Sequence, residues 1–296
     1  MSQMAEGNTF KAPQSAQTQN TPGLESKMAP PSEPTKLETP DGIAEYKGSG
    51  KLKGKKALIT GGDSGIGRSV AALYAKEGAD VTIVYLPVEE EDAQGTKKLV
   101  EKEGKQCLLL PGDLRERNFC KKAVDEHVKK FGTLNILINN ASKQYSCADL
   151  KEIDLDQVED VFHSNIIQMF AITKFALPHM NKGDSIINNT SVTTFRGTAS
   201  MVDYASTKGA IVGFTRSLAL QLIPKGIRVN AVAPGSTYTP IQVDTRDADQ
   251  MQDWASSKPL GRPGQPSEVA TSFVFLASSD ATLFCGQILH PYPLGE

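Results

Sequence analysis

The sequence is most constrained by a regular alternation of short apolar segments with amphipathic ones, which begins near Lys51. The apolar segments have the length of strands and lie at Ala57–Thr60, Val81–Tyr85, Cys107–Leu110, Ile136–Ile138, Ser185–Asn188 and Ile227–Val232. Helical patterns lie between them, at Gly67–Glu77, Glu89–Glu103, Phe119–Phe131 and Tyr204–Leu222. Such alternation requires right-handed crossovers, which put parallel strands into one sheet with helices on both faces. We therefore predict one α/β domain of the doubly wound, Rossmann type over residues 51–296, with ligands at the carboxyl ends of the strands.

Residues 1–50 have a different composition from the rest of the chain. Six of the seventeen prolines lie in the first forty positions, and large apolar residues such as Phe10, Leu24 and Leu37 are isolated there. A segment of this kind buries too little apolar surface to offset the entropy of ordering it. We expect a disordered or loosely draped polar arm, and we expect its removal to leave the domain almost unaltered.

Charge and composition exclude several classes of function. The net charge is −2 and the isoelectric point is about 6.1, so no basic field would attract nucleic acid or anionic lipid. No apolar run approaches the roughly 18–20 residues of a membrane span. Residues 1–50 contain neither an apolar signal core nor an arginine, which favours a cytoplasmic location. The four cysteines and four histidines follow no metal-ligand spacing, so we expect no metal site.

A glycine-rich loop follows the first predicted strand. After Ala57–Thr60 come Gly61, Gly62, Asp63, Ser64, Gly65, Ile66 and Gly67, and then a helical pattern. Glycines at such a position let the backbone approach a pyrophosphate, and the helix N-terminus supplies N–H donors for it. The spacing is G-x-x-x-G-x-G rather than G-x-G-x-x-G. We predict that this loop binds a dinucleotide cofactor.

Three polar residues suggest the chemistry. Tyr204 and Lys208 are four residues apart within a predicted helix and therefore share one face, and Ser191 lies thirteen residues upstream. An ammonium beside a phenol favours the phenolate and lowers the phenol pKa. A serine hydroxyl can hold a carbonyl oxygen while the tyrosine transfers its proton. With a dinucleotide loop, this set is typical of hydride exchange at an alcohol or carbonyl carbon.

The ribose end of the predicted cofactor site is less informative. The second strand ends in Tyr85, Leu86 and Pro87, which offer no carboxylate for a 2′-hydroxyl and no cation for a 2′-phosphate. The acidic run at residues 89–92 would repel a phosphate if it faced the site. These observations favour NAD weakly over NADP.

Taken together, these motifs resemble the short-chain dehydrogenase/reductase superfamily over about residues 52–289. The loop TGGDSGIG is similar to its T-G-x-x-x-G-x-G motif, NNAS at 139–142 to its N-N-A-G motif, and APG at 233–235 to its cofactor-closing turn. Asn165, Ser191, Tyr204 and Lys208 match its catalytic tetrad. Further segments, among them YLPVEEEDA and DYASTKGAIVGFTRSLA, resemble its branch of bacterial aldehyde reductases and plant glucose and ribitol dehydrogenase homologues.

The resemblance implies roles for individual residues. Tyr204 would be the general acid or base, Lys208 would hold the nicotinamide ribose and lower the tyrosine pKa, and Ser191 would polarise the substrate oxygen. Asn165 would anchor a water in the proton relay; bonding of the backbone across a helix bulge is the alternative for this residue. The implied cofactor-binding residues are Gly61, Ser64, Gly65, Ile66, Gly67, Asp113, Leu114, Asn139, Ala141, Tyr204, Lys208, Pro234, Gly235, Thr237 and Thr239.

The implied function is an NAD(P)-dependent oxidoreductase that interconverts a polyol or sugar hydroxyl with an aldehyde or ketone. A cofactor-sensing protein without turnover is the alternative, but such a protein would usually have lost Ser191, Tyr204 or Lys208. The segment 239–258 follows no pattern that names the substrate. A homo-oligomer, either a tetramer or a dimer, is expected, although the C-terminal HPYPLGE departs from the H-x-N-G-G of relatives, as Ser142 does from their glycine.

Overall fold

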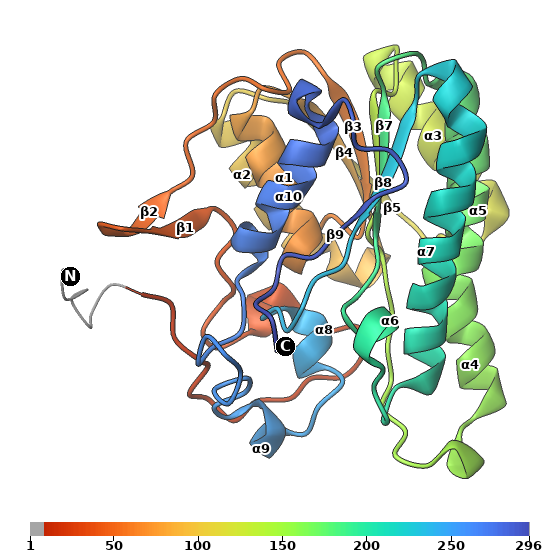
Figure 1. Cartoon of the computed structure of the whole chain (residues 1–296). Helices are drawn as coiled ribbons and strands as arrows, with labels where there is room; N and C mark the ends of the chain where they lie inside the picture. Colours follow the sequence, from red (N-terminus) through yellow and green to blue (C-terminus); the bar gives the residue numbers. More distant parts are fainter. Residues whose placement is uncertain (1–8, 296) are drawn as a thin grey trace.

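The structure, a computed structural model, describes residues 9–295 and contains the parallel sheet that the alternation predicts (Figure 1). Seven strands pair in parallel in the order β5-β4-β3-β6-β7-β8-β9. Their bounds are β3 Lys56–Thr60, β4 Asp80–Tyr85, β5 Cys107–Pro111, β6 Ile136–Asn139, β7 Ser185–Asn189, β8 Arg228–Val232 and β9 Ile288–Leu289. Six of the strands coincide with the predicted ones to within a residue. The two-residue strand β9 is too short to give a sequence signal.

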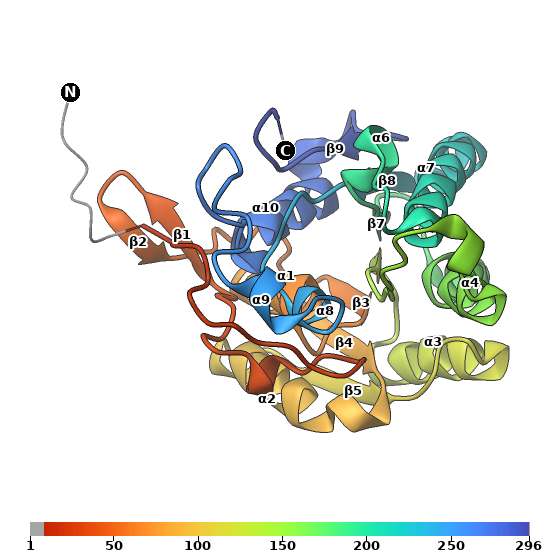
Figure 2. The same cartoon turned by 90° about the horizontal axis from the view of Figure 1, so that it is seen from below.

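Helices cover both faces of the sheet (Figures 1 and 2). One face carries α1 (Gly65–Lys76), α2 (Glu90–Lys102) and α10 (Pro266–Ala277). The other carries α3 (Arg117–Phe131), α4 (Leu155–Phe162), α5 (Gln168–Ala176) and α7 (Val202–Leu222). Shorter helices are α6 (Thr193–Arg196), α8 (Pro240–Val243) and α9 (Ala248–Met251), and 3-10 turns lie at Pro87–Glu89, Leu150–Glu152, Leu177–His179, Ile223–Lys225 and Ser279–Ala281.

The strands read as continuous apolar runs because both faces of the sheet are buried. Successive side chains of a strand point to opposite faces, so Ile59 packs into the core beneath α1 and α10 while its neighbour Leu58 packs into the core beneath α3 and α7. Both residues are fully buried. The chain forms β3, β4 and β5 in one direction and then crosses back to place β6 on the other side of β3. This reversal opens a crevice at the carboxyl ends of β3 and β6.

The structure describes the N-terminal arm from residue 9 onward and places it along the domain. It contains the 3-10 helix η1 (Glu25–Lys27) and a hairpin of β1 (Lys36–Thr39) and β2 (Gly42–Glu45). Seen from below, it runs past the carboxyl edge of the sheet and beside α8 and α9 (Figure 2). Met28 is 6% exposed and packs with Tyr238 and Val243. The arm therefore does bury apolar surface, contrary to expectation, because one methionine enters a cluster supplied by the C-terminal half of the chain.

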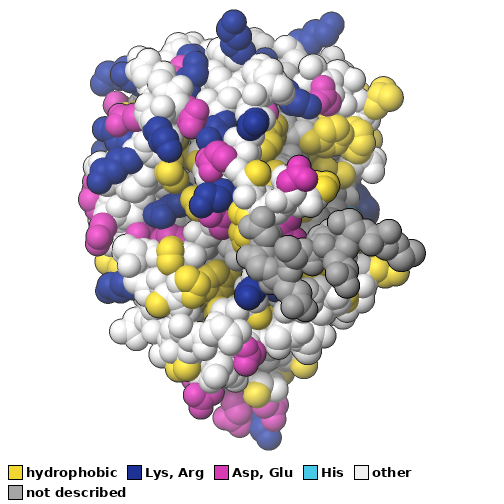
Figure 3. Space-filling view, turned by 90° about the vertical axis from the view of Figure 1, so that its left-hand side faces the viewer, with side chains coloured by type: hydrophobic (Ala, Val, Ile, Leu, Met, Phe, Trp, Pro, Cys, Tyr) yellow, Lys and Arg dark blue, Asp and Glu magenta, His cyan; other side chains and the backbone are white. Residues whose placement is uncertain are grey.

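The surface shows no single-sign field on the face drawn in Figure 3, where acidic and basic side chains are interspersed with apolar ones. This mixture accords with a net charge of −2. Over residues 9–295, no helix is both long and apolar enough to cross a membrane.

Candidate active site

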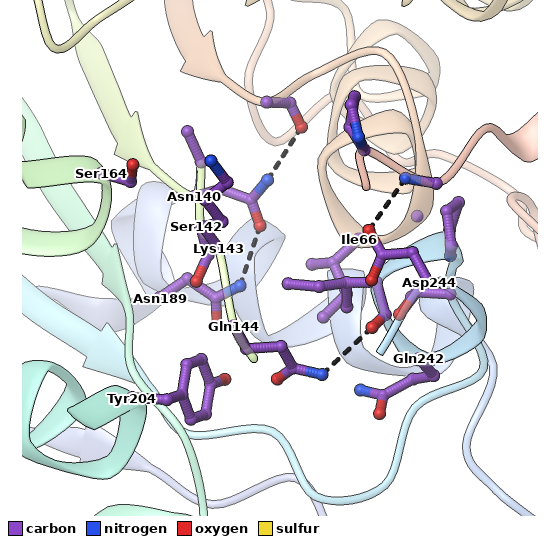
Figure 4. Close-up of a pocket in the computed structure, with 18 of the residues that line it drawn as sticks. Ile66, Asn140, Ser142, Lys143, Gln144, Ser164, Asn189, Tyr204, Gln242 and Asp244 are labelled. Carbon is purple, nitrogen blue, oxygen red and sulfur yellow. Dashed lines mark hydrogen bonds between the residues drawn. The ribbon is translucent and has the colours of Figure 1, made fainter. Parts of the chain in front are cut away.

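A cavity of about 410 Å³ lies at the carboxyl edge of the sheet, in the crevice between β3 and β6 (Figure 4). Its volume suits a cofactor or a small ligand. Fourteen of the predicted site residues line it: Gly61, Ser64, Gly65, Ile66, Asp113, Leu114, Ala141, Ser191, Tyr204, Lys208, Pro234, Gly235, Thr237 and Thr239. Gly67, Asn139 and Asn165 do not; each lies behind the wall and supports it.

The glycine-rich loop is shaped by two close approaches. A Cβ on Gly67 would lie 1.8 Å from the Gly61 carbonyl oxygen, so only glycine lets the first turn of α1 pack against the end of β3. Gly65 has a φ of 49°, and a Cβ there would lie 3.0 Å from the Thr239 side chain. The loop thus meets the 237–239 turn directly. The N-terminus of α1 opens into the cavity between them.

Asn139 and Asn140, at the end of β6, differ in position from what the sequence predicts. Asn139 is 2% exposed and donates to Asn188 (2.9 Å) inside the sheet, so it does not line the cavity as a cofactor-binding residue would. Asn140 does line the cavity: its amide donates to the Gly61 carbonyl (2.8 Å) and accepts from Asn189 (2.8 Å; Figure 4). Adjacent residues of a strand face opposite sides of the sheet. Because residues 139 and 140 are both asparagine, the sequence does not show which of the two faces the cavity.

Tyr204 and Lys208 share one face of α7, as their spacing predicts. The Tyr204 side chain points into the cavity (Figure 4). The Lys208 Nζ lies 5.3 Å from the centroid of the tyrosine ring and donates to the Asn189 carbonyl (2.9 Å). Ser191, which follows β7, completes the group through a hydrogen bond with Tyr204. The three side chains meet because the ends of β7 and α7 converge on the carboxyl edge of the sheet.

The electrostatics of Tyr204 differ from expectation. Burial raises its pKa to about 12, and the effects that oppose this rise are the hydrogen bond with Ser191 and the charge of Arg246. Lys208 was expected to supply that charge, but burial lowers its own pKa to about 7. Arg246, in the segment after α8, was not singled out in the sequence. No local pattern marks it, because its approach to Tyr204 depends entirely on how residues 239–258 fold over the cavity.

Asn165 lies in a five-residue π-helix, His163–Ile167, between α4 and α5. Single π-turns of this kind are frequent at functional sites because they redirect one side chain. The Asn165 amide donates to the Lys143 carbonyl (2.8 Å) and to Thr207 (3.0 Å), and it accepts from the Lys143 N–H (2.7 Å). In this structure Asn165 therefore bonds backbone across the bulge, and it fixes the chain beyond β6 to the helix that carries Tyr204.

The ribose end of the cavity contains several charged residues, of which only Asp113 was predicted to belong to the site. Asp113 lines the wall, and Arg115 binds its carboxylate (Nη2 at 2.6 Å) and lowers its pKa. Arg115 itself lines the cavity, whereas Arg68 bonds to the Asp63 carbonyl and to Thr96 and lies outside it. Burial raises the pKa of Glu89 to about 8 and that of Asp63 to about 6.

The arm supplies part of the same cavity. Thr21, Pro22 and Gly23 line it, and the Gly23 N–H donates to Asp244 (2.8 Å). Glu25 is 2% exposed, and its carboxylate accepts from the Gly65 N–H at the start of α1 (2.9 Å). Asp92 of α2 in turn accepts from the backbone N–H groups of Glu25 (2.6 Å) and Ser26 (2.9 Å).

The residues present fit a nicotinamide dinucleotide. The close approach at Gly67 brings the start of α1 to the cavity, and the buried Oδ1 of Asn189, on the cavity wall, has no hydrogen-bond partner in the described chain. Ser64–Ile66 would hold the pyrophosphate, Lys208 the nicotinamide ribose, and the Pro234–Thr239 turn would cover the nicotinamide.

Residues 61–291 match a family model whose description is enoyl-(acyl carrier protein) reductase. The chain belongs to the short-chain dehydrogenase/reductase family. It is 48% identical to NADPH-dependent aldehyde reductase 1, chloroplastic, of Arabidopsis thaliana over 84% of this chain and 88% of that protein. It is 44% identical to glucose and ribitol dehydrogenase of Daucus carota over 97% of each. A short-chain dehydrogenase from Burkholderia cenocepacia in complex with NADP superimposes with a TM-score of 0.76 at 31% identity, covering 81% of this chain and 97% of that one.

These relatives confirm the family and branch that the motifs suggested, and they make the chain an oxidoreductase of the short-chain dehydrogenase/reductase family with a nicotinamide cofactor. The match begins at Gly61, and the solved structure covers 81% of the chain. The arm of residues 9–50 thus lies before the part of the chain that the family model describes.

The buried amine of this short-chain dehydrogenase/reductase gives a pH-dependent prediction. Lys208 has a folded-state pKa of about 7 against an ordinary value of 10.5. The unfolded chain therefore binds more protons between these pH values, and stability rises with pH across this interval. Below pH 7 the folded protein bears the full cost of a buried ammonium. We expect Lys208→Met to remove this cost, so that the melting temperature of the variant relative to the native protein is highest near pH 6 and declines toward pH 9.

Thermal unfolding followed by circular dichroism from pH 6 to 9 measures this trend. The trend, not the absolute difference, is the result, because the variant also loses the bond to the Asn189 carbonyl at every pH. Lys225→Met, which removes an exposed lysine from the 3-10 turn after the C-terminal end of α7, is the control and should show no trend. A difference that stays constant or grows with pH would contradict the assigned shift.

Proposed function

We propose that this protein interconverts an alcohol and an aldehyde or ketone by hydride transfer, with Ser191, Tyr204 and Lys208 as its proton-handling residues and Asn165 as a positioning residue. The observation that supports this most is the meeting of Ser191, Tyr204 and Lys208 on the wall of a cavity that also contains the dinucleotide loop. The plant relatives, named for aldehyde reduction and for glucose and ribitol oxidation, act on this class of bond.

The bound nicotinamide supplies or takes the hydride. Ser191 holds the substrate oxygen, and the Tyr204 hydroxyl gives a proton to that oxygen in reduction or takes one in oxidation. With a pKa of about 12, Tyr204 retains its proton at neutral pH, which suits carbonyl reduction. Oxidation requires the phenolate and is expected to gain from alkaline pH. Lys208, whose pKa is about 7, passes the proton onward. Asn165 holds the backbone at Lys143, on the cavity wall, in place.

The cofactor is, in our proposal, NADP(H). The preference for NAD that the sequence suggested has no support among the relatives, of which one is named NADPH-dependent and another holds NADP. Two features of this chain agree with NADP(H). Arg115 offers a guanidinium at the ribose end, and a pKa of about 8 keeps Glu89 protonated at neutral pH, so that it does not repel a 2′-phosphate. Equal or weaker binding of NADP(H) than of NAD(H) in a direct titration would contradict this.

The decisive experiment is a panel of aldehydes, polyols and sugars followed at the nicotinamide absorbance with both cofactors at pH 7 and pH 9. Turnover of at least one carbonyl or alcohol supports the proposal. The alternative, a cofactor-sensing protein, predicts cofactor binding with no turnover on the whole panel. The intact Ser191, Tyr204 and Lys208 group gives no reason to favour it.

We also propose that the protein is a homo-oligomer that acts in the cytoplasm. Large apolar side chains are exposed on α5 (Phe170, 55% exposed) and α7 (Leu220, 74% exposed). Surfaces of this kind favour burial against a second copy of the chain. Light scattering of the purified protein and fractionation of its source cells test the two statements separately.

A further inference from the structure

Arg246 is a cation whose environment the mechanism does not explain. It lines the same cavity as Tyr204, and each group acts electrostatically on the other. Its guanidinium carbon lies 5.0 Å from the centroid of the Trp254 ring, and its Nη1 donates to the side chain and the carbonyl of Gln242. These contacts hold the guanidinium plane in place, and Gln242 and Tyr204 face the same hollow (Figure 4).

The remaining edge of the guanidinium has no partner in the part of the chain that the structure describes. In residues 9–295, neither Nε nor Nη2 of Arg246 makes a hydrogen bond, and no carboxylate forms an ion pair with it. Asp244, two residues before Arg246, accepts instead from the Gly23 N–H and from Thr245. Asp247, the next residue along the chain, makes no ion pair with Arg246 within residues 9–295 either. A half-buried cation with no carboxylate in contact with it is unfavourable, and such groups in proteins are normally paired.

Two other arginines of this chain are paired with carboxylates. Arg262 binds Glu268 with both terminal nitrogens and also pairs with Glu38. Arg115 binds Asp113 and Asp160. In contrast, Arg246 has a stacked ring and one amide to fix its orientation, and on the cavity wall its Nε–Nη2 edge has no partner among residues 9–295. This edge matches the two oxygens of a carboxylate or phosphate.

We propose that Arg246 binds an oxyanion of the substrate, so that the preferred substrate is an aldehyde or ketone that also carries a carboxylate or phosphate group. The inference rests on the proposed function, because it takes Tyr204 as the site of the carbonyl oxygen. Ser191 and Tyr204 hold one end of such a substrate and Arg246 the other. A neutral aldehyde leaves the guanidinium uncompensated and is a poorer substrate.

The test compares pairs of aldehydes that differ in charge at one end. 4-Oxobutanoate is set against its primary amide, and glyceraldehyde 3-phosphate against glyceraldehyde, with kcat/KM measured for the native protein, Arg246→Gln and Arg246→Lys. We expect at least a tenfold preference for the anion in one pair, and the pair that shows it identifies carboxylate or phosphate. In Arg246→Gln the ratio should fall to within about threefold of one. Arg246→Lys should be intermediate, because it keeps the charge but not the fork.

Arg196→Gln is the matched control, since Arg196 also lines the cavity but is exposed and lies in α6 rather than in the segment after α8. It should keep the anion preference. The ratio is measured within one variant, so a general loss of activity does not affect it. A native ratio near one in both pairs, or a ratio that survives Arg246→Gln, would overturn the proposal. So would a weaker cofactor affinity of Arg246→Gln with unchanged ratios, which would assign Arg246 to a cofactor phosphate.

A second readout does not depend on turnover. Trp254 is the only tryptophan of the chain and stacks on Arg246, so its fluorescence reports on the guanidinium. With oxidised cofactor bound, butanoate or inorganic phosphate should change the emission saturably, whereas butanamide should not, and Arg246→Gln should abolish the response. If no aldehyde or alcohol is turned over but this response is found, the proposed function fails and the oxyanion site stands. If turnover is found with neither response nor preference, only the oxyanion site fails.

Discussion

Tyr204→Phe is expected to lower kcat by about 10²–10⁴-fold, the usual contribution of a positioned general acid. The substitution removes one hydroxyl and leaves the ring that packs at the cavity wall, with the Lys208 ammonium 5.3 Å from its centroid. Because the lost group acts on the substrate oxygen, the dissociation constant of the cofactor should change by no more than a few fold. Steady-state kinetics at the nicotinamide absorbance, together with a cofactor titration, measure the two effects separately.

Tyr145→Phe is the matched control for this experiment. Tyr145 lines the same cavity, and its hydroxyl bonds to Asp160 (3.4 Å). Its loss should cost less than tenfold in kcat. If Tyr204→Phe behaved like Tyr145→Phe, the proton would have another source and the assignment of Tyr204 as acid would be wrong.

Deletion of residues 1–48 is expected to lower the melting temperature by roughly 10 °C and to weaken cofactor binding by at least tenfold. This reverses the sequence-based expectation of an almost silent deletion. Burying a methionine such as Met28 contributes about 1.5–3 kcal/mol. A hydrogen bond to a charged group such as Glu25 contributes about 1.5–3 kcal/mol more. For a domain of this size, each kcal/mol corresponds to about 2–4 °C.

The effect on the cofactor follows from where the arm lies. Thr21, Pro22 and Gly23 form part of the cavity wall, and Glu25 holds the Gly65 N–H at the start of the dinucleotide loop. Gly23 also runs so close to α8 that a Cβ on it would lie 2.6 Å from the Pro240 carbonyl oxygen. The arm therefore joins the cofactor loop to the segment that carries Arg246. Without it, both ends of the site lose a support.

A point variant separates this contact from general loss of the arm. Glu25→Leu keeps the size of the side chain but leaves the Gly65 and Ser32 N–H groups without their acceptor. It should reproduce much of the loss in cofactor affinity, whereas Lys27→Ala, at an exposed position two residues away, should not. A melting temperature within one degree of the native value for the deletion would show that the arm is not part of the folded domain.

The sequence alone was sufficient for features that depend on local spacing. The strands of the sheet could be placed because a strand buried on both faces must be apolar throughout, as in Leu58 and Ile59. Tyr204 and Lys208 could be paired because four residues make about one turn of a helix. The dinucleotide loop could be assigned because its backbone packs too closely for a side chain. At Gly67, for example, a Cβ atom would collide with the Gly61 carbonyl oxygen, so only glycine fits.

Contacts between distant segments were decided by the tertiary structure. Asn140 rather than Asn139 faces the cavity because of the direction in which β6 emerges. Glu25 reaches Gly65 across forty residues, and Arg246 reaches Tyr204 across about as many. A single buried carboxylate, methionine or arginine leaves no periodic pattern in the sequence. Its role in the site depends on which residues the rest of the fold places beside it. Local geometry therefore determined the secondary-structure elements and the motifs. Packing between distant segments decided that the N-terminal arm belongs to the site, and which asparagine and which cation face the cavity.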